Sequence, residues 1–328
     1  MPVLIIIGLI VSVLIAFLLI PLLKKLKAGQ PVLSYVSEHK AKSGTPTMGG
    51  IIFLIPLIVS LFFLKIQSLA FVSVVIIIAY GIIGFLDDYI KIKYKHNEGL
   101  KPWQKILSQI IVAVAVSVYC YNNEIIGSEI YIPFFNVSIE FGVWSILLYI
   151  FIFIAATNSV NLTDGLDGLA GSVTFVYFIF LMIFITIKNN YYSDLGSILI
   201  TKEYNSLLSV IYLLTGSLLA FLIFNSFPAK VFMGDTGSMA LGAAVATFSV
   251  FSGFSFVILI LGIMYVVSSL SVILQVLYYK ATKKRIFLMA PYHHHLQMKG
   301  LSEVRISVVY ISVTVIAGIL LLCYGIIF

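Results

Sequence analysis

The sequence predicts an all-α, polytopic integral membrane protein with about ten transmembrane helices. Hydrophobic residues make up 61% of the 328 residues, charged residues only 10%, and the mean hydropathy is +1.12. A water-facing surface needs far more charge, which excludes a soluble domain of this length. Apolar segments of spanning length recur without a long linker between them, which predicts one integral-membrane domain over residues 1–328.

The first predicted helix, 2–23, is an apolar run followed by Lys24 and Lys25. It lacks a positively charged start and a small-residue cleavage site, so we expect a retained span rather than a signal peptide, with its N-terminus outside. The later segments are also apolar, and the eighth is short and rich in Gly and Ala. The remaining predicted helices are 48–64, 67–86, 105–121, 143–160, 168–187, 206–225, 238–252, 254–279 and 305–327.

The basic residues predict the orientation of these helices. With both termini outside, the connections after the odd-numbered helices face the cytoplasm. All but three of the 20 basic residues lie in or beside those connections, the exceptions being Lys65, Lys188 and Lys202. This is the asymmetry expected for cytoplasmic loops. It also explains the net charge of +7, so no nucleic-acid partner is expected.

An acidic pair closes the predicted helix 67–86, in the sequence GFLDDYIK. Asp87 and Asp88 repel each other, and a divalent cation or a lysine relieves that repulsion. Lys91 follows Asp87 by four residues, within reach on one helical face. The pattern favours a functional site at the cytoplasmic boundary of the membrane, and a solvated helix end is the alternative.

Three other connections on the predicted cytoplasmic side combine polar side chains with glycines, which let a backbone approach a ligand closely. NSVNLTDGLDGLAG, 158–171, offers amides and carboxylates to a polar head group, or is an ordinary polar turn. In FNSFPAKVFMGDTGSMALG, 224–242, Asp235 lies in a glycine-flanked turn that suits Mg²⁺, or it caps the next helix. EHKAKSGTPTMGG, 38–50, is a basic loop able to cradle phosphate, although it is not a Walker motif.

Three of the five histidines form one run, in the sequence APYHHHLQ, 290–297. Consecutive side chains point in different directions, so these three do not converge on one metal ion. The i, i+4 pair with a glutamate that a metalloprotease site requires is missing. The run instead favours a polar platform, because imidazoles donate to phosphate oxygens and orient proton transfers near neutral pH.

Taken in order, GTPTMGG, LDDYIK, NLTDGLDGLA, MGDTGSMALG and PYHHHLQMKG closely resemble the motifs of the polyprenyl-phosphate N-acetylhexosamine-1-phosphate transferases. The resemblance covers nearly the whole chain, and the triple histidine favours the phospho-N-acetylmuramoyl-pentapeptide-transferase branch. One departure is Leu296-Gln297, where that branch more often has an aromatic residue and then an acid. This difference concerns details of sugar or peptide contact.

The resemblance implies a reaction, a cofactor and a location. Phospho-MurNAc-pentapeptide would move from UDP-MurNAc-pentapeptide to undecaprenyl phosphate, giving lipid I and UMP with Mg²⁺, in the first membrane step of peptidoglycan synthesis. The active site would lie at the cytoplasmic face of the bacterial plasma membrane, and the protein would be a multi-pass homodimer in the lipid bilayer. A basic face would attract both anionic substrates, and phosphoryl transfer needs positioning and charge neutralisation.

The resemblance also implies roles for individual residues. Asp235 would bind Mg²⁺, and Asp87 would deprotonate or position the acceptor phosphate. Asp88 would support either the metal ion or the base Asp87. Whether transfer occurs in one step or through a covalent intermediate on Asp88 stays open. His294 would take part in catalysis, with His293 and His295 contacting the substrate. The other implied substrate contacts are Lys42, Thr47, Lys91, Lys105, Asn161, Asp164, Asp167, Asn225, Phe232 and Gln275.

Two other functions remain open. A sister transferase that moves GlcNAc-1-phosphate would share the aspartates and differ in the histidine loop. A transporter would use intramembrane acids as an ion path, but here the acids lie at one membrane face and no internal repeat is evident.

Overall fold

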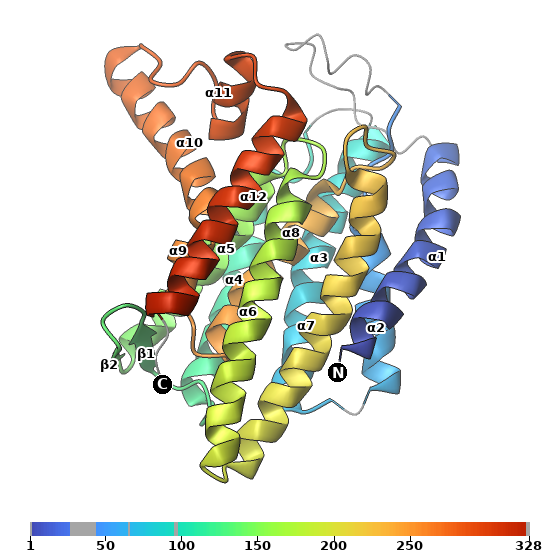
Figure 1. Cartoon of the computed structure of the whole chain (residues 1–328). Helices are drawn as coiled ribbons and strands as arrows, with labels where there is room; N and C mark the ends of the chain where they lie inside the picture. Colours follow the sequence, from blue (N-terminus) through green and yellow to red (C-terminus); the bar gives the residue numbers. More distant parts are fainter. Residues whose placement is uncertain (1, 27–43, 65, 95–97, 326–328) are drawn as a thin grey trace.

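The computed structural model describes residues 2–26, 44–64, 66–94 and 98–325, and it confirms the all-α class (Figure 1). Lys42 lies outside these ranges. The described elements are α1 (Val3–Lys25), α2 (Ile51–Phe63), α3 (Ser68–Tyr94), α4 (Pro102–Asn122), β1 (Glu129–Ile132), β2 (Val137–Glu140), α5 (Trp144–Thr163), α6 (Leu169–Asp194), α7 (Ile198–Asn225), α8 (Gly234–Phe251), α9 (Val257–Leu261), α10 (Ile263–Thr282), α11 (Tyr292–Met298), α12 (Glu303–Leu320) and a π-helical turn (Leu321–Gly325).

Each of the ten predicted segments contains a helix, and eight helices of the described chain are long and apolar enough to cross a membrane. These are α1, α3, α4, α5, α6, α7, α10 and α12, while α2 is shorter, with 13 residues. The predicted helix 254–279 is divided at Gly262 into α9 and α10. The chain is therefore a polytopic membrane protein, and the count of ten crossings stays a prediction.

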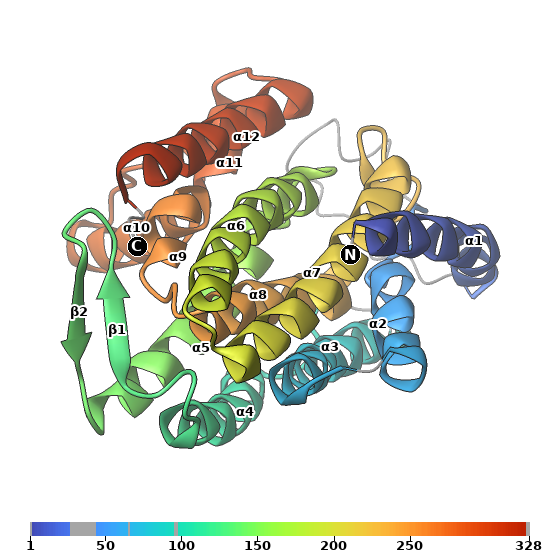
Figure 2. The ribbon, with the colours of Figure 1, turned by 60° about the horizontal axis from the view of Figure 1, so that its bottom comes forward.

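Helix α8 occupies the centre of the bundle. All its residues from Thr236 to Phe251 are buried, and Figure 2 shows α3, α5, α6 and α7 around it. Its Gly, Ala and Ser side chains are small, which lets neighbouring backbones approach it closely. The Gly/Ala-rich composition of this segment thus follows from its central position rather than from contact with lipid.

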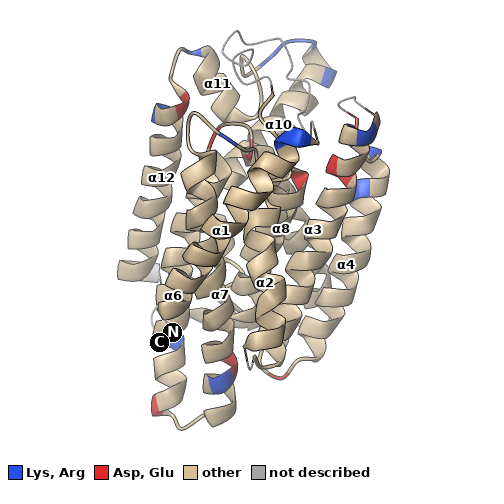
Figure 3. Ribbon diagram, turned by 90° about the vertical axis from the view of Figure 1, so that its right-hand side faces the viewer, with Lys and Arg blue, Asp and Glu red and all other residues tan. Residues whose placement is uncertain are grey.

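Charged residues gather at the two ends of the bundle, and most lie at the end that carries α11 (Figure 3). Both chain termini are marked toward the opposite end. This arrangement agrees with the predicted asymmetry of the basic residues, and the orientation in a membrane stays a prediction.

Two charged side chains at the opposite end from α11 hold the far ends of α3 and α8. Glu203 accepts from the hydroxyl of Ser68 at 2.7 Å and from the backbone N–H of Leu69 at 2.9 Å, so a carboxylate meets the N-terminus of α3. Lys188 Nζ donates to the carbonyl of Ser252 at 2.8 Å, so an ammonium meets the C-terminus of α8. Both charges complement the helix dipoles.

The structure extends α3 well beyond its predicted end at residue 86. The helix continues through Asp87 and Asp88 to Tyr94. Polar side chains past the apolar run predicted an ending there, but Asp87 and Lys91 form an i, i+4 ion pair that supports the helix. The hairpin of β1 and β2 and the short helix α11 were not among the predicted elements.

Candidate active site

Acidic and basic side chains meet at the ends of α3, α4 and α8. Lys91 Nζ lies 2.6 Å from Asp87 Oδ2 and 2.9 Å from Asp235 Oδ2, and Lys105 Nζ lies 2.8 Å from the same Asp235 oxygen. The lysine side chains are 16% and 18% exposed, so these charges interact in a largely dehydrated setting. The predicted proximity of Lys91 to Asp87 is confirmed.

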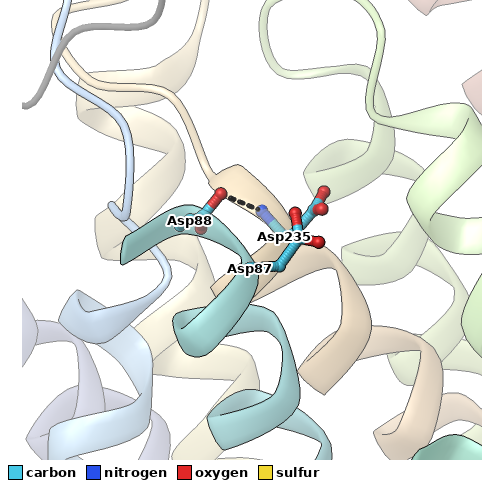
Figure 4. A group of neighbouring side chains, drawn as sticks. All are labelled: Asp87, Asp88 and Asp235. Atoms are coloured by element: carbon cyan, nitrogen blue, oxygen red, sulfur yellow. Dashed lines mark hydrogen bonds between the residues drawn. The ribbon is translucent and has the colours of Figure 1, made fainter. Parts of the chain in front are cut away.

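Asp88 points away from this ion-pair cluster (Figure 4). It is fully buried, and its Oδ1 accepts from the backbone N–H of Asp235 at 3.2 Å. Its Oδ2 accepts from the backbone N–H and the hydroxyl of Thr236, at 2.9 and 2.7 Å. A carboxylate in this position satisfies free N–H groups at the N-terminus of α8 and complements the helix dipole. Asp88 therefore fixes the start of α8 against α3.

The aspartates offer a donor set for a divalent cation. Asp87, Asp88 and Asp235 each present a carboxylate oxygen, and these oxygens lie within 4.8 Å of one another. Magnesium takes one or two carboxylates and completes its shell with phosphate and water oxygens. Since the hydrogen bonds of Asp88 turn it toward α8, the facing carboxylates of Asp235 and Asp87 fit magnesium best (Figure 4).

The end of α5 forms a second wall of the site. Asn161 Nδ2 donates to Asp235 Oδ1 and to the hydroxyl of Ser238, both at 2.8 Å. Asp164 follows α5 directly; burial raises its pKa to about 8, and the negative charges of Asp235, Asp88 and Asp167 add to that rise. Asn161 therefore lies in the carboxylate cluster, and Asp164 lies close enough to it for the charges of Asp235 and Asp88 to act on its pKa.

Three other predicted site residues hold the connection before α8. The backbone N–H of Phe232 donates to the carbonyl of Pro46 at 2.8 Å, which joins the two glycine-rich loops. Asn225 is buried and donates to the carbonyl of Val231 at 2.9 Å. Thr47 is buried beside this junction. These contacts are structural, so the roles of the three residues toward a substrate stay predictions.

Asp167 lies next to the same connection. It is buried, and its Oδ2 accepts from the backbone N–H of Ala229 at 3.0 Å. This hydrogen bond ties the motif at 158–171 to the connection between α7 and α8.

The three histidines have three different environments on α11. His293 is fully buried, and its Nε2 lies so close to Gly165 that a β-carbon added there would be 2.2 Å away. Burial holds the pKa of His293 well below its usual value, and the neighbouring His294 adds to that effect. The Nδ1 of His294 pairs with Gln297 Oε1 at 3.2 Å. His293 thus seats α11 on the turn that carries Asp164.

His295 and Gln275 hold the loop between α10 and α11. Gln275 Oε1 accepts from the backbone N–H groups of Ile286 and Phe287, at 3.1 and 3.0 Å. The Nδ1 of His295 accepts from the N–H of Leu288 at 3.1 Å. This assigns the proton of a neutral His295 ring to Nε2, which can donate outward.

Several residues of the site were not singled out from the sequence. Thr236 and Ser238 were visible inside the quoted motif MGDTGS, directly after Asp235. The backbone N–H of Leu100 donates to Asp87 Oδ1 at 2.9 Å, and a backbone contact of this kind leaves no side-chain signal. Gly165 was quoted only as one of several glycines, and its contact with His293 is tertiary.

Comparisons with known proteins show the family of the chain. The sequence profile described as Glycosyl transferase family 4 matches residues 69–253, and the phospho-N-acetylmuramoyl-pentapeptide-transferase signature 1 matches residues 42–54. Proteins named phospho-N-acetylmuramoyl-pentapeptide-transferase are similar over nearly the full length of both chains. The protein of Clostridium perfringens (strain 13 / Type A) is 44% identical, covering 95% of this chain and 94% of its own. That of Clostridioides difficile (strain 630) is 42% identical, covering 94% and 93%, and that of Bacillus subtilis (strain 168) is 39% identical, covering 98% and 95%. The chain therefore belongs to the phospho-N-acetylmuramoyl-pentapeptide-transferase family.

Proposed function

We propose that this protein transfers phospho-MurNAc-pentapeptide from UDP-MurNAc-pentapeptide to undecaprenyl phosphate, giving lipid I and UMP. The observation that carries the proposal is the cluster of Asp87, Lys91, Lys105 and Asp235 at one end of a bundle of membrane-spanning helices. A lipid acceptor and a water-soluble donor can meet only at such a boundary. The names of the relatives support the same reaction.

In this reaction an oxygen of the acceptor phosphate attacks the sugar-linked phosphorus of the donor. A new P–O bond forms between the acceptor oxygen and this phosphorus. The bond from the phosphorus to the bridging oxygen breaks, and UMP leaves with that oxygen. Lys91 and Lys105 would neutralise the pyrophosphate, because their ammonium groups already converge on one oxygen of Asp235. Asp87 would orient the acceptor phosphate and take its proton.

Magnesium bound by Asp235, with Asp87 beside it, would neutralise charge on the phosphates as it builds up in the transition state. Asn161 would keep Asp235 in place through its hydrogen bond to Oδ1. Among the predicted contacts, Asn161 donates to Asp235, Asp164 follows Asn161 in the next turn, and His294 lies on the helix that packs on Gly165. We assign these three residues to the nucleotide-sugar. We assign Thr47, Asp167, Asn225 and Phe232 to the walls of that pocket, with Gln275, His293 and His295 holding its histidine side.

The environment of Asp88 favours direct transfer over a covalent route. A nucleophile must reach the phosphorus, but Asp88 is fully buried and both its oxygens accept hydrogen bonds from the start of α8. We therefore propose that Asp88 positions α8 and does not form an aspartyl intermediate. UMP release by the enzyme without lipid acceptor would contradict this assignment.

An apolar groove between α5, α9 and α10 suits the chain of the acceptor. It is lined by apolar side chains such as Phe151, Ile152 and Leu259, and it includes Ser159. The groove reaches Ser159 near the end of α5 that carries Asn161, although these two side chains lie on different faces of the helix. We propose that the polyprenyl chain follows the groove. The resemblance further supports a multi-pass protein of the bacterial plasma membrane, with a cytoplasmic site and a homodimeric assembly.

The reaction is tested by UMP release from the purified protein in lipid nanodiscs with undecaprenyl phosphate and Mg²⁺. We expect release with UDP-MurNAc-pentapeptide and not with UDP-GlcNAc, and we expect EDTA to abolish it. Release with UDP-GlcNAc alone would indicate the sister transferase. No release with either donor would contradict a transferase, and uptake of labelled substrate into vesicles would then support a transporter.

Replacing Gly165 with Ala is expected to raise the KM for the donor and to lower kcat, each about tenfold, because overpacking of this size costs about 1–3 kcal/mol. The new β-carbon would lie 2.2 Å from His293 Nε2 and would push α11 off the Asp164 turn. Initial rates of UMP release measure both parameters. The double variant Gly165→Ala/His293→Ala should lose no more activity than His293→Ala alone; an additive loss would show that the contact does not transmit the effect.

A further inference from the structure

A large cavity lies beside the histidine helix, outside the carboxylate cluster. It has a volume of about 910 Å³, opens to the surface, and is lined by one face of α10, the loop that follows, and the end of α11. Val272, Gln275, Val276 and Tyr279 line it from α10, at the spacing of a single helical face. A cavity of this size is large enough to hold a drug-sized ligand or a short peptide.

The walls of this cavity are held by hydrogen bonds before any ligand arrives. Gln275 fixes the loop through two backbone N–H groups, and His295 fixes it through the N–H of Leu288. Arg285 Nη1 donates to the carbonyl of Leu288 at 3.4 Å. A preformed wall reduces the ordering cost of binding.

The cavity is connected to the candidate active site through two contacts. His293 seats α11 on Gly165, in the turn that carries Asp164. On α10, the hydroxyl of Ser269 donates to that of Ser159 at 2.6 Å, one turn from the cavity residue Val272. The elements that wall the cavity therefore pack directly on the parts of the chain that carry Asp164 and Ser159.

The charges of the lining select an anionic ligand. Lys280, Lys283 and Arg285 line the cavity, and no carboxylate is among the described residues that do so. The rest of the lining is mostly apolar, with Leu288, Met289 and Met298 beside the α10 face. Three cations on an otherwise apolar wall match a chain that carries both carboxylates and aliphatic side chains.

We infer that this cavity binds the peptide of the donor, with Lys280, Lys283 and Arg285 pairing its carboxylates. The inference rests on the proposed function, because a pentapeptide attached through its N-terminus ends in a free carboxylate. The phosphates are already matched by Lys91 and Lys105 at Asp235, which leaves the cations of the cavity for the other end of the donor. These residues would thus select donors that carry an acidic peptide.

The test compares the triple variant Lys280→Met/Lys283→Met/Arg285→Met with the wild type in nanodiscs of zwitterionic lipid. Each solvent-exposed ion pair contributes little on its own, so we expect loss of all three to raise the KM for UDP-MurNAc-pentapeptide about tenfold. Lys284→Met is the matched control, since Lys284 lies in the same loop but does not line the cavity. A triple variant with the KM of this control would overturn the inference.

A second donor, in which the C-terminal carboxylate is converted to the amide, tests whether the rise in KM depends on that carboxylate. Wild-type enzyme should bind the amidated donor more weakly than the natural donor. The triple replacement should raise the KM for the amidated donor by a smaller factor than the KM for the natural donor. If the triple replacement lowered the affinity for both donors equally, or did so only in anionic lipid, the three cations would not pair with the C-terminal carboxylate of the peptide. If the wild type turned over neither donor, the proposed function would fail, and direct titration of both donors would still test the cavity.

Discussion

Replacing Asp235 with Asn is expected to lower the rate of UMP release about a thousandfold or more, because it removes both a metal ligand and the shared counter-ion of two lysines. Asp235 Oδ2 lies 2.9 Å from Lys91 Nζ and 2.8 Å from Lys105 Nζ. Asparagine has nearly the same shape but carries no charge. The measurement is the initial rate of UMP release at saturating donor, acceptor and Mg²⁺.

The fold should survive this replacement, which separates chemistry from stability. The backbone N–H of residue 235 would still donate to Asp88, and the side-chain carbonyl could still accept from Asn161. The control is Asp194→Asn, since Asp194 is an exposed acid at the far end of α6. More than one-tenth of wild-type activity in Asp235→Asn at ordinary Mg²⁺ concentrations would show that this carboxylate is not the metal ligand.

The sequence was sufficient for the fold class and for the local geometry of the site. Composition and the length of the apolar runs require a membrane bundle, because a chain this apolar cannot cover a water-facing surface. The i, i+4 relation of Asp87 and Lys91 is set by the helical period, and the structure confirms it at 2.6 Å. Contacts of this kind depend only on residues close together in the chain.

Contacts between distant segments could not be predicted in the same way. Asp87 and Asp88 are neighbours in sequence, yet only the packing of α3 against α8 turns Asp88 toward the backbone of Thr236 while Asp87 faces Asp235. Lys105 reaches Asp235 across 130 positions of sequence. These relations follow from which helix faces meet, and hydrophobic periodicity does not specify that pairing in a bundle whose outer faces are also apolar.

The histidine run shows the same limit. Three adjacent imidazoles predicted a polar platform, and different environments were expected because consecutive side chains point in different directions. The burial of His293 against Gly165 depends on α11, a seven-residue helix whose amphipathic pattern is too short to predict, and on its contact with a turn far away in sequence. The predicted group therefore divides into one buried packing residue and two rings on the loop side.

Replacing Gly84 with Ala is expected to reduce UMP release at least about a hundredfold, because overpacking against a backbone cannot be relieved by a side-chain rotation. A β-carbon at Gly84 would lie 2.0 Å from the carbonyl oxygen of Asp235 and 2.7 Å from the backbone N of Thr236. Helix α3 would have to move away from α8. That movement would separate Asp88 from the start of α8, and Asp87 and Lys91 from Asp235.

Gly81→Ala is the matched control, one turn earlier on the same helix. Its β-carbon would meet Leu54 Cδ1 at 3.0 Å, the flexible end of a side chain, and Ala240 Cβ at 3.6 Å. Both variants gain about 1 kcal/mol of helix propensity, so that contribution cancels in the comparison. UMP release and the Mg²⁺-dependent rise in unfolding temperature then report on the distance between α3 and the start of α8. Equal activity and an equal rise in the two variants would mean that this close approach does not set the geometry of the carboxylates.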